Sequence, residues 1–104
     1  MEVKLANKWG IPKDVEVAVL ARDMQCIYCG VEFDSNRTSS KSWEHIINDI
    51  NIATLENIAL CCVGCNASKG AKLLRDWLES PNAKRRGITS ATLSPIVLRA
   101  LAGI

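Results

Sequence analysis

Five cysteines and a single histidine are the side chains best suited to chemistry in this 104-residue chain. Four of the cysteines form two C-x-x-C pairs, Cys26 with Cys29 and Cys62 with Cys65, and the histidine lies between the pairs. Each pair offers two soft sulfur ligands, and together they match the four-sulfur tetrahedral shell of a structural zinc ion. The spacing therefore predicts a Zn²⁺ that joins the two segments of the chain.

The fifth cysteine, Cys61, falls outside both pairs. It directly precedes Cys62, and neighbouring side chains of a strand point to opposite faces, so we expect a small buried side chain rather than a ligand. The N-terminus lacks the pattern of a secretory signal, and no apolar run is long enough to span a bilayer. We therefore expect an intracellular, cytoplasmic protein without a membrane segment, in which paired cysteines favour metal over disulfides.

Polar residues between and beside the cysteine pairs have the types needed for hydrolysis. His45 is the only side chain whose ordinary pKa, about 6.5, lets it accept a proton from water near neutral pH. Glu44 and Asn66 carry oxygen donors of the kind that Mg²⁺ or Mn²⁺ takes. Neighbours on a regular strand point to opposite faces, so Glu44 and His45 can serve one site only if the strand twists or ends there.

The order of these residues resembles the pattern of the HNH nuclease family. Between residues 26 and 69 the chain reads CIYC, EH, NIAL and CVGCNASK in this order. The family pattern is C-x-x-C, then Asp-His or a variant, then Asn in an apolar strand, then C-x-x-C-[HN]-x-x-K. Glu44 and Asn66 stand where many relatives have Asp and His, so the resemblance leaves the choice of catalytic metal open.

The resemblance implies a small α+β domain of the ββα-metal, treble-clef-like type, stapled by zinc and flanked by N- and C-terminal helices. It also implies that His45 is the general base, that Asn57 ties down the loop that orients it, and that Glu44 and Asn66 hold a catalytic Mg²⁺ or Mn²⁺. The expected activity is metal-dependent hydrolysis of double-stranded DNA, nicking one strand per active site with low sequence specificity. The alternative is a zinc-dependent DNA-binding or interaction module on the same scaffold without turnover.

Each of these residues also has a purely structural interpretation. His45 could be a hydrogen-bonded structural histidine or a zinc ligand, although four cysteines already complete a zinc shell. Glu44 could be a surface glutamate paired with a lysine, and Asn57 a turn residue at the start of a strand. Lys69, one helical turn after Asn66, could pair with a phosphate or be a solvated helix lysine.

The overall charge gives weak guidance about partners. The formal charge is +2, and four zinc-bound thiolates with one Zn²⁺ would remove about two charges. Between residues 69 and 86, however, basic side chains outnumber acidic ones, which predicts a local basic surface beside Asn66. The candidate DNA-binding residues on it are Lys69, Lys72, Arg75, Arg85 and Arg86.

The chain is short enough to form one domain, residues 1–104, with a single core of modest size. We divide it into an N-terminal arm and helix (1–23), a zinc-bearing core (24–79) and a basic link with a C-terminal helix (80–104). Trp9 in the arm is expected to pack on the domain. The first helix should run from Ile11-Pro12 to Arg22, and its candidate buried positions are Val15, Val17, Val19 and Leu20.

The core must place both cysteine pairs and the polar residues. Gly30 is expected to take the positive φ that a turn around the first pair needs. Strands are predicted at 43–47 and 57–61. One helix is predicted at 66–79, ended by Pro81, with an apolar face that follows a 3.6-residue period: Leu73, Leu74, Trp77 and Leu78. The last helix is predicted to begin at Pro95, to end at Gly103 and to pack on the core or form a dimer contact, so that a monomer and a homodimer both stay open.

Overall fold

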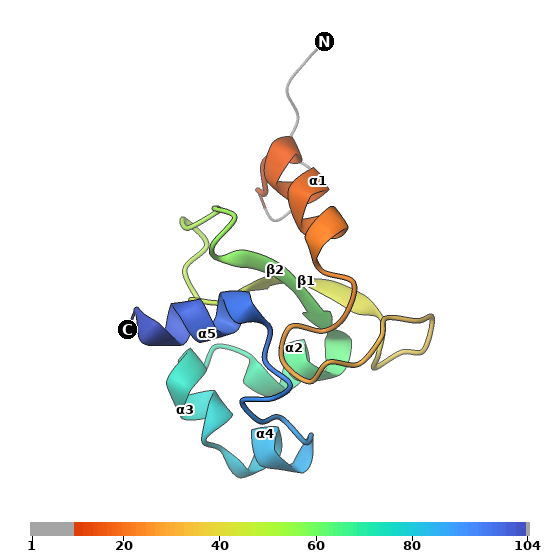
Figure 1. Ribbon diagram of the computed structural model, residues 1–104, viewed down its shortest axis with the longest axis vertical. Helices are drawn as coiled ribbons and strands as arrows, with labels where there is room; N and C mark the ends of the chain where they lie inside the picture. The colour runs from red at the N-terminus through yellow and green to blue at the C-terminus, as the bar shows by residue number, and fades with distance from the viewer. Residues whose placement is uncertain (1–9, 104) are drawn as a thin grey trace.

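The computed structural model describes residues 10–103 and shows a small α+β domain, in agreement with the predicted class (Figure 1). The predicted packing of Trp9 lies outside the described residues. No helix in the described part is long and apolar enough to cross a membrane. The elements of that part are α1 (Lys13–Arg22), β1 (Lys41–His45), β2 (Ile58–Cys62), α2 (Val63–Lys69), α3 (Leu74–Leu78), α4 (Pro81–Arg85) and α5 (Pro95–Ala102).

The two strands form an antiparallel hairpin in which Lys41 lies opposite Cys62 and His45 opposite Ile58. Both strands are displaced from their predicted limits, β1 by two residues and β2 by one. All five residues of β2 are buried, because alternate side chains join two different apolar clusters on its two faces. The hairpin therefore lies at the centre of the domain.

Helix α1 extends away from the rest of the domain and contacts the hairpin along one side only (Figure 1). Val19 is completely buried and Val15 partly buried against β2. Val17 and Leu20 were also predicted to be buried, and this prediction is wrong: their side chains are 55% and 39% exposed. A helix that packs at its end on a narrow two-stranded sheet buries only the positions that face the strand.

The end of α1 is fixed to β2 by Arg22 and Asp23. Arg22 Nε lies 2.7 Å from Asp23 Oδ1, and Arg22 Nη2 donates to the carbonyl oxygen of Ile58 at 2.8 Å. Asp23 Oδ2 accepts from the amide of Leu60 at 3.0 Å. These contacts satisfy backbone groups on the edge of β2 that faces away from β1. They stabilise a strand edge that would otherwise be unpaired.

The single helix predicted at 66–79 is wrong, because the structure has two helices there. Helix α2 begins directly after β2 and ends at Gly70, whose φ of 51° is favourable only for glycine. The turn changes the phase of the following helix: Leu74 and Trp77 are buried, but Leu73, predicted on the same apolar face, is 69% exposed. The apolar period of the sequence thus spans two separate elements.

In the C-terminal part, residues 80–103, the structure differs from the prediction around Pro81 and agrees with it in the last helix. Pro81, expected to end a helix, instead begins α4, and Ser80 caps that helix by accepting from the amide of Ala83 at 3.2 Å. The segment predicted as a basic link is therefore partly helical. Helix α5 begins at Pro95 and ends at Gly103, as predicted.

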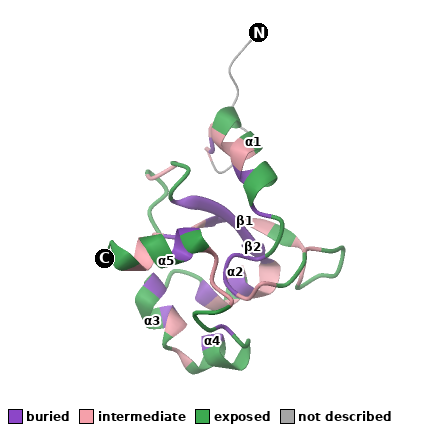
Figure 2. Ribbon diagram, in the orientation of Figure 1, coloured by how far each residue is buried: buried purple, intermediate pink, exposed green. Residues whose placement is uncertain are grey.

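The main core lies between the hairpin and the C-terminal helices, where Figure 2 shows most of the buried residues. Trp77 is completely buried and meets Tyr28 edge to face, with ring centroids 4.9 Å apart. Its Nε1 donates to Ser68 Oγ at 2.9 Å, which satisfies the indole donor. Cys61 is also completely buried, which confirms its predicted position.

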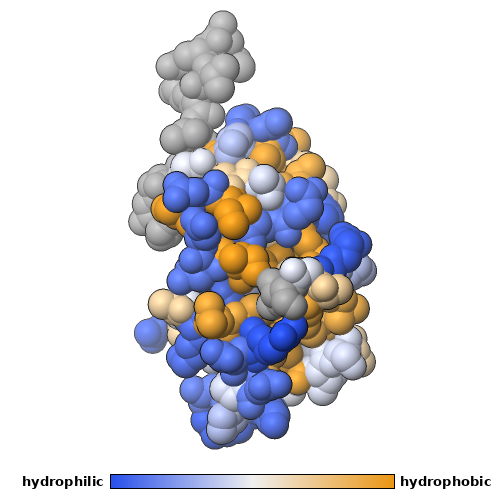
Figure 3. All heavy atoms as spheres, turned by 90° about the vertical axis from the view of Figure 1, so that its left-hand side faces the viewer, coloured by the Kyte–Doolittle hydropathy of each residue, from blue (hydrophilic) through white to orange (hydrophobic). Residues whose placement is uncertain are grey.

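Several large apolar side chains remain on the surface. Met24, Ile50 and Leu73 are each more than three-fifths exposed, and Leu98 of α5 is 43% exposed. On the face shown in Figure 3, apolar side chains form patches between hydrophilic ones. Exposed apolar residues of this kind are normal on protein surfaces, so a monomer and a homodimer both stay compatible with the fold.

Candidate metal centre and the residues around His45

The two C-x-x-C pairs converge, as their spacing predicts. The sulfur atoms of Cys26, Cys29, Cys62 and Cys65, hereafter the cysteine cluster, all lie within 4.8 Å of one another. Cys29 Sγ and Cys62 Sγ are 3.8 Å apart. A tetrahedral zinc ion with Zn–S bonds of about 2.3 Å separates its sulfurs by about 3.8 Å. The cluster therefore fits a structural zinc ion, and its cysteines are free thiols rather than disulfides.

Both pairs of the cysteine cluster are built in the same way. In each, the amide of the second cysteine donates to the sulfur of the first, from Cys29 to Cys26 at 3.5 Å and from Cys65 to Cys62 at 3.4 Å. Gly30 follows the first pair with a φ of 79°, which confirms the predicted positive φ. The second pair lies where β2 passes into α2. Each pair is thus shaped by its own short turn.

The four sulfurs shift one another's pKa values. A hydrogen bond with Cys65 lowers the pKa of Cys26 to about 4, and the same bond raises the pKa of Cys65. Burial raises the pKa of Cys29 to about 11. One thiolate is therefore stabilised at neutral pH, and a bound divalent cation would displace the remaining protons.

Arg86 reaches the cysteine cluster from the C-terminal end of α4. Its Nε donates to Cys65 Sγ at 3.3 Å and its Nη2 to Cys62 Sγ at 3.6 Å. Gly64 leaves the room for this contact, because a Cβ at that position would overlap with the guanidinium of Arg86. Arg86 was predicted to contact DNA, and its guanidinium instead lies on two sulfurs.

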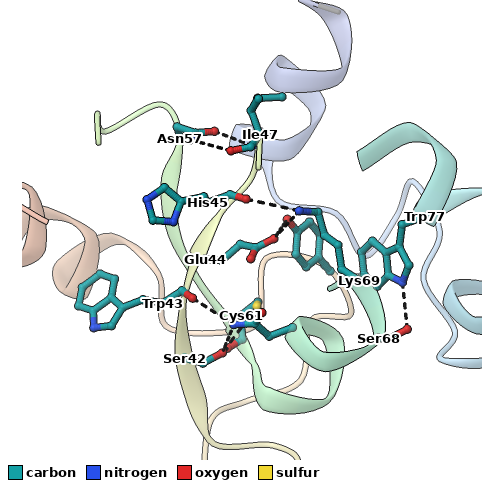
Figure 4. A network of polar contacts seen from close by, with 12 residues as sticks. Ser42, Trp43, Glu44, His45, Ile47, Asn57, Cys61, Ser68, Lys69 and Trp77 are labelled. Carbon is teal, nitrogen blue, oxygen red and sulfur yellow. Dashed lines mark hydrogen bonds and ion pairs between the residues drawn. The ribbon is translucent and has the colours of Figure 1, made fainter. Parts of the chain in front are cut away.

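Glu44 points into the main core, where two donors hold its carboxylate (Figure 4). Its Oε2 accepts from Tyr28 Oη at 2.5 Å and lies 3.0 Å from Lys69 Nζ. Burial, together with the carboxylate, raises the pKa of Tyr28, so the phenol stays protonated and donates. The alternative interpretation, a surface glutamate paired with a lysine, is confirmed for the lysine partner. It is wrong about the surface, because Glu44 is only 6% exposed.

Lys69 is buried, and this corrects both predictions for it. A phosphate contact and a solvated helix lysine each require an exposed ammonium, but the Lys69 side chain is only 2% exposed. Helix α2 packs along β1, so the ammonium meets Glu44 and also donates to the carbonyl oxygen of His45 at 3.4 Å. A buried ammonium needs such partners, because desolvation without them is costly.

The imidazole of His45 lies on the opposite side of β1 from Glu44 (Figure 4). Strand pairing stays regular through both residues, so no twist brings them to one face. Burial lowers the pKa of His45, with Lys69 acting in the same direction and Glu44 and Asp49 in the opposite one. A lowered pKa favours the neutral ring, which can accept a proton, at pH 7. Its Nε2 is buried and has no hydrogen-bond partner within residues 10–103.

Asn57 holds the loop that connects the two strands. Its Oδ1 accepts from the amide of Ile47 at 2.6 Å, and its Nδ2 donates to the carbonyl oxygens of Ile47 and Ile52 at 3.1 and 3.0 Å. The side chain thus fixes the backbone two residues after His45, which is the kind of contact expected for it. Its catalytic importance stays a prediction.

Asn66 is held against β1 by its amide nitrogen. Its Nδ2 donates to Ser42 Oγ at 3.0 Å and to the carbonyl oxygen of Trp43 at 3.1 Å. The Glu44 carboxylate, which was predicted to bind Mg²⁺ or Mn²⁺, is paired with Lys69 instead. Within residues 10–103, the cysteine cluster is the only convergent group of three or more cysteine, histidine or acidic side chains.

The remaining basic residues of the predicted DNA-binding set lie on the surface. Lys72, Arg75 and Arg85 are exposed, and Arg75 Nη2 donates to the carbonyl oxygen of Leu101 at 3.3 Å. Arg85 and Arg86 line an open hollow of about 590 Å³ between α2 and α4. Lys69 is therefore removed from the predicted set, and DNA contact by Lys72, Arg75 and Arg85 stays a prediction.

Comparison with known proteins adds no relative to this description. No model of a known protein family matches the chain, and no curated protein or solved structure matches it either. The resemblance to the HNH pattern therefore rests on the residues themselves.

Sequence reasoning missed two side chains that help to build the site. Tyr28 lies inside the first C-x-x-C pair and donates to Glu44 from there. A tyrosine between two expected zinc ligands lies beside a centre that excludes water, and a buried phenol needs a hydrogen-bond partner, which was the available signal. For Arg86 the signal was weaker: the glycine inside the second pair, Gly64, indicated that something approaches the chain closely there.

Proposed function

We propose that this chain is a zinc-stapled endonuclease of the HNH kind, with a ββα-metal core that hydrolyses DNA phosphodiester bonds. The observation that carries the proposal is the position of His45, whose buried Nε2 has no hydrogen-bond partner within residues 10–103. A buried polar atom without a partner is costly, and a purely structural histidine would be expected to have one. The order β1, β2, α2, with the second cysteine pair at the last junction, supports the same proposal.

Zinc in the cysteine cluster would act on the fold rather than on the substrate. Four thiolates close a tetrahedral shell and leave no position for water or phosphate. Binding the ion would hold the turn around Cys26 and Cys29 against the start of α2. The ion would supply a cross-link that adds to the stability of a modest core.

In the proposed reaction, His45 takes a proton from a water molecule as the water oxygen attacks phosphorus. The bond from phosphorus to the 3′ oxygen breaks, leaving a 5′-phosphate and, after protonation by solvent, a 3′-hydroxyl. Because Nε2 is buried, the ring would accept this proton at Nδ1 and keep its own proton on Nε2. Asn57 supports this step from a distance, because its hydrogen bonds to Ile47 fix the backbone that follows the histidine.

No step is assigned to a catalytic divalent cation. The Glu44 carboxylate is paired with Lys69 and lies on the other side of β1 from His45, so it would not hold Mg²⁺ or Mn²⁺ beside the imidazole. The plasmid assay below measures whether cleavage requires such an ion. Lys72, Arg75 and Arg85 would contact the DNA backbone, so we expect low sequence specificity and binding that weakens steeply with salt.

Cleavage of supercoiled plasmid tests the proposal. The purified protein, with one zinc per chain, is incubated with plasmid in buffer containing Mg²⁺, Mn²⁺ or neither ion. We expect conversion to the nicked circle by the natural chain and loss of that activity in His45→Ala at unchanged zinc content. Asn51→Ala, in the exposed part of the same loop, serves as a matched control that keeps activity.

Two results would contradict the proposal. One is an intact plasmid under all metal conditions with zinc-loaded, folded protein. The other is equal trace cleavage by the natural chain and by His45→Ala, which indicates a contaminating nuclease.

The second candidate function is DNA binding without turnover, and one observation favours it. The carboxylate of Glu44, which the HNH pattern would give to the catalytic metal, is paired with Lys69 in the core. A binding module predicts equal DNA affinity for the natural chain and for His45→Ala, with no cleavage by either protein. The endonuclease predicts the same equal affinity together with cleavage by the natural chain alone.

A further inference from the structure

We infer that Arg86 is part of the zinc site, as an outer residue whose guanidinium holds the two sulfurs of the second cysteine pair. The contact is two-pronged, from Nε to Cys65 Sγ and from Nη2 to Cys62 Sγ. Planar guanidinium groups are well suited to contact two acceptors at once. The inference goes beyond the proposed endonuclease activity, because it concerns how the metal is retained.

The negative charge of a zinc-loaded cluster explains why a positive group lies at its sulfurs. Zinc with four thiolates carries a net charge of about −2, and three of the four cysteines are buried. A positive group at the sulfurs offsets part of that charge, and its hydrogen bonds make the sulfurs less basic and less reactive toward acid and electrophiles. Arg86 is exposed on its outer side, so its guanidinium stands between solvent and the second pair.

Gly64 provides a second, independent indication. It lies between Cys62 and Cys65 inside α2, where alanine would be the better helix former. A Cβ at this position would lie 3.0 Å from Cζ of Arg86 and overlap with Nη2. Glycine at 64 therefore leaves the space that the guanidinium occupies.

Zinc release to a chromophoric chelator tests the inference, with Arg86→Met compared to Arg85→Met. Arg85 is the adjacent, exposed arginine whose side chain contacts only Asn82 of its own helix among the hydrogen bonds described here. We expect zinc transfer about ten-fold faster from Arg86→Met, and a rate within about two-fold of the natural chain for Arg85→Met. Equal rates for the two variants would overturn the inference.

Alkylation by N-ethylmaleimide, mapped by mass spectrometry, gives a readout that general destabilisation would not. In Arg86→Met, Cys62 and Cys65 should react before Cys26 and Cys29, because only the second pair loses its cover. A uniform increase at all four cysteines would show that the variant loosens the whole domain, and it would contradict a specific contact.

Gly64→Ala tests the same contact while Arg86 is kept, which is decisive if Arg86→Met does not fold. The added Cβ should displace the guanidinium and speed zinc transfer, although alanine favours the helix. Combining Gly64→Ala with Arg86→Met should add nothing to the faster single variant, because both changes remove one contact. Multiplied effects in the double variant would show that the two residues act separately and would overturn the shared contact.

Discussion

The cysteine cluster and the residues at the end of β1 bring side chains together in opposite ways. Cys29 and Cys62 are 33 positions apart in the chain, and their sulfurs lie 3.8 Å from each other. Glu44 and His45 are neighbours in the chain, and their side chains lie on opposite faces of a strand. Adjacent residues of a regular strand point to opposite faces, so their side chains are kept apart. The two cysteine turns are joined by a long connection, so their sulfurs can meet.

The two regions also differ in what holds them. The cysteine cluster fits an external ion, and its geometry is that of a tetrahedral shell. The Glu44 region is held by the protein's own groups, a buried carboxylate between Tyr28 and Lys69. The first should therefore depend on metal and the second on packing, and this contrast can be tested.

The largest effect is expected at the cysteine cluster. Cys65→Ser should abolish stoichiometric zinc binding and with it cooperative unfolding, because zinc sites of this kind contribute on the order of 10 kcal/mol to folding. Zinc analysis and circular dichroism on heating would measure both. Cys61→Ala is the control: it removes a buried sulfur outside the cluster, costs about 1–2 kcal/mol and leaves one zinc per chain. Equal zinc loss in the two variants would contradict the prediction.

The next effect concerns the buried pair. Lys69→Met leaves the Glu44 carboxylate without its cation and should lower the free energy of unfolding by about 3–5 kcal/mol, measured with urea, at unchanged zinc content. Lys72→Met, exposed after α2, should change it by less than about 0.5 kcal/mol. The double variant Glu44→Gln with Lys69→Met should recover much of the loss. If Lys69→Met alone is as stable as the natural chain, the Glu44 region does not depend on this buried ion pair.

A smaller loss is expected in the loop after His45. Asn57→Ala removes three hydrogen bonds to backbone groups of Ile47 and Ile52 and should cost about 2 kcal/mol. Asn51→Ala is the control, because that side chain is exposed in the same loop. If both variants have the same urea midpoint as the natural chain, Asn57 does not hold the loop.

The smallest effect is the pH dependence contributed by His45. Because its pKa is lowered in the folded state, the unfolded chain takes up a proton first as the pH falls below about 6.5. The contribution to stability is therefore complete above pH 6.5 and declines as the pH falls toward the folded pKa. The chain has one histidine, so an NMR titration assigns the value directly, and we expect a midpoint below 6.5. A midpoint at or above 6.5 would contradict it, and His45→Gln should remove the slope.

The parts of the fold that could be predicted depend on short stretches of chain. The turn with Gly30 and the end of α5 at Gly103 follow from residues within a few positions, and the cysteine pairs that converge are each such a short turn. The single helix at 66–79 could not be corrected from its apolar period, because the turn at Gly70 separates two helices that both bury apolar residues. Glycine at 70 was a signal of this break.

By itself, the sequence determined the cysteine cluster, because each C-x-x-C turn is shaped by its own backbone and the sulfurs need only be brought together. Only the tertiary structure decided the partners of Glu44, Lys69 and Arg86. A buried charge takes whichever opposite group the packing brings near, so Lys69 pairs with Glu44 across 25 positions of the chain and Arg86 lies on two sulfurs. Such choices depend on how α2 and α4 pack against β1 and the cluster, and local patterns do not contain that information.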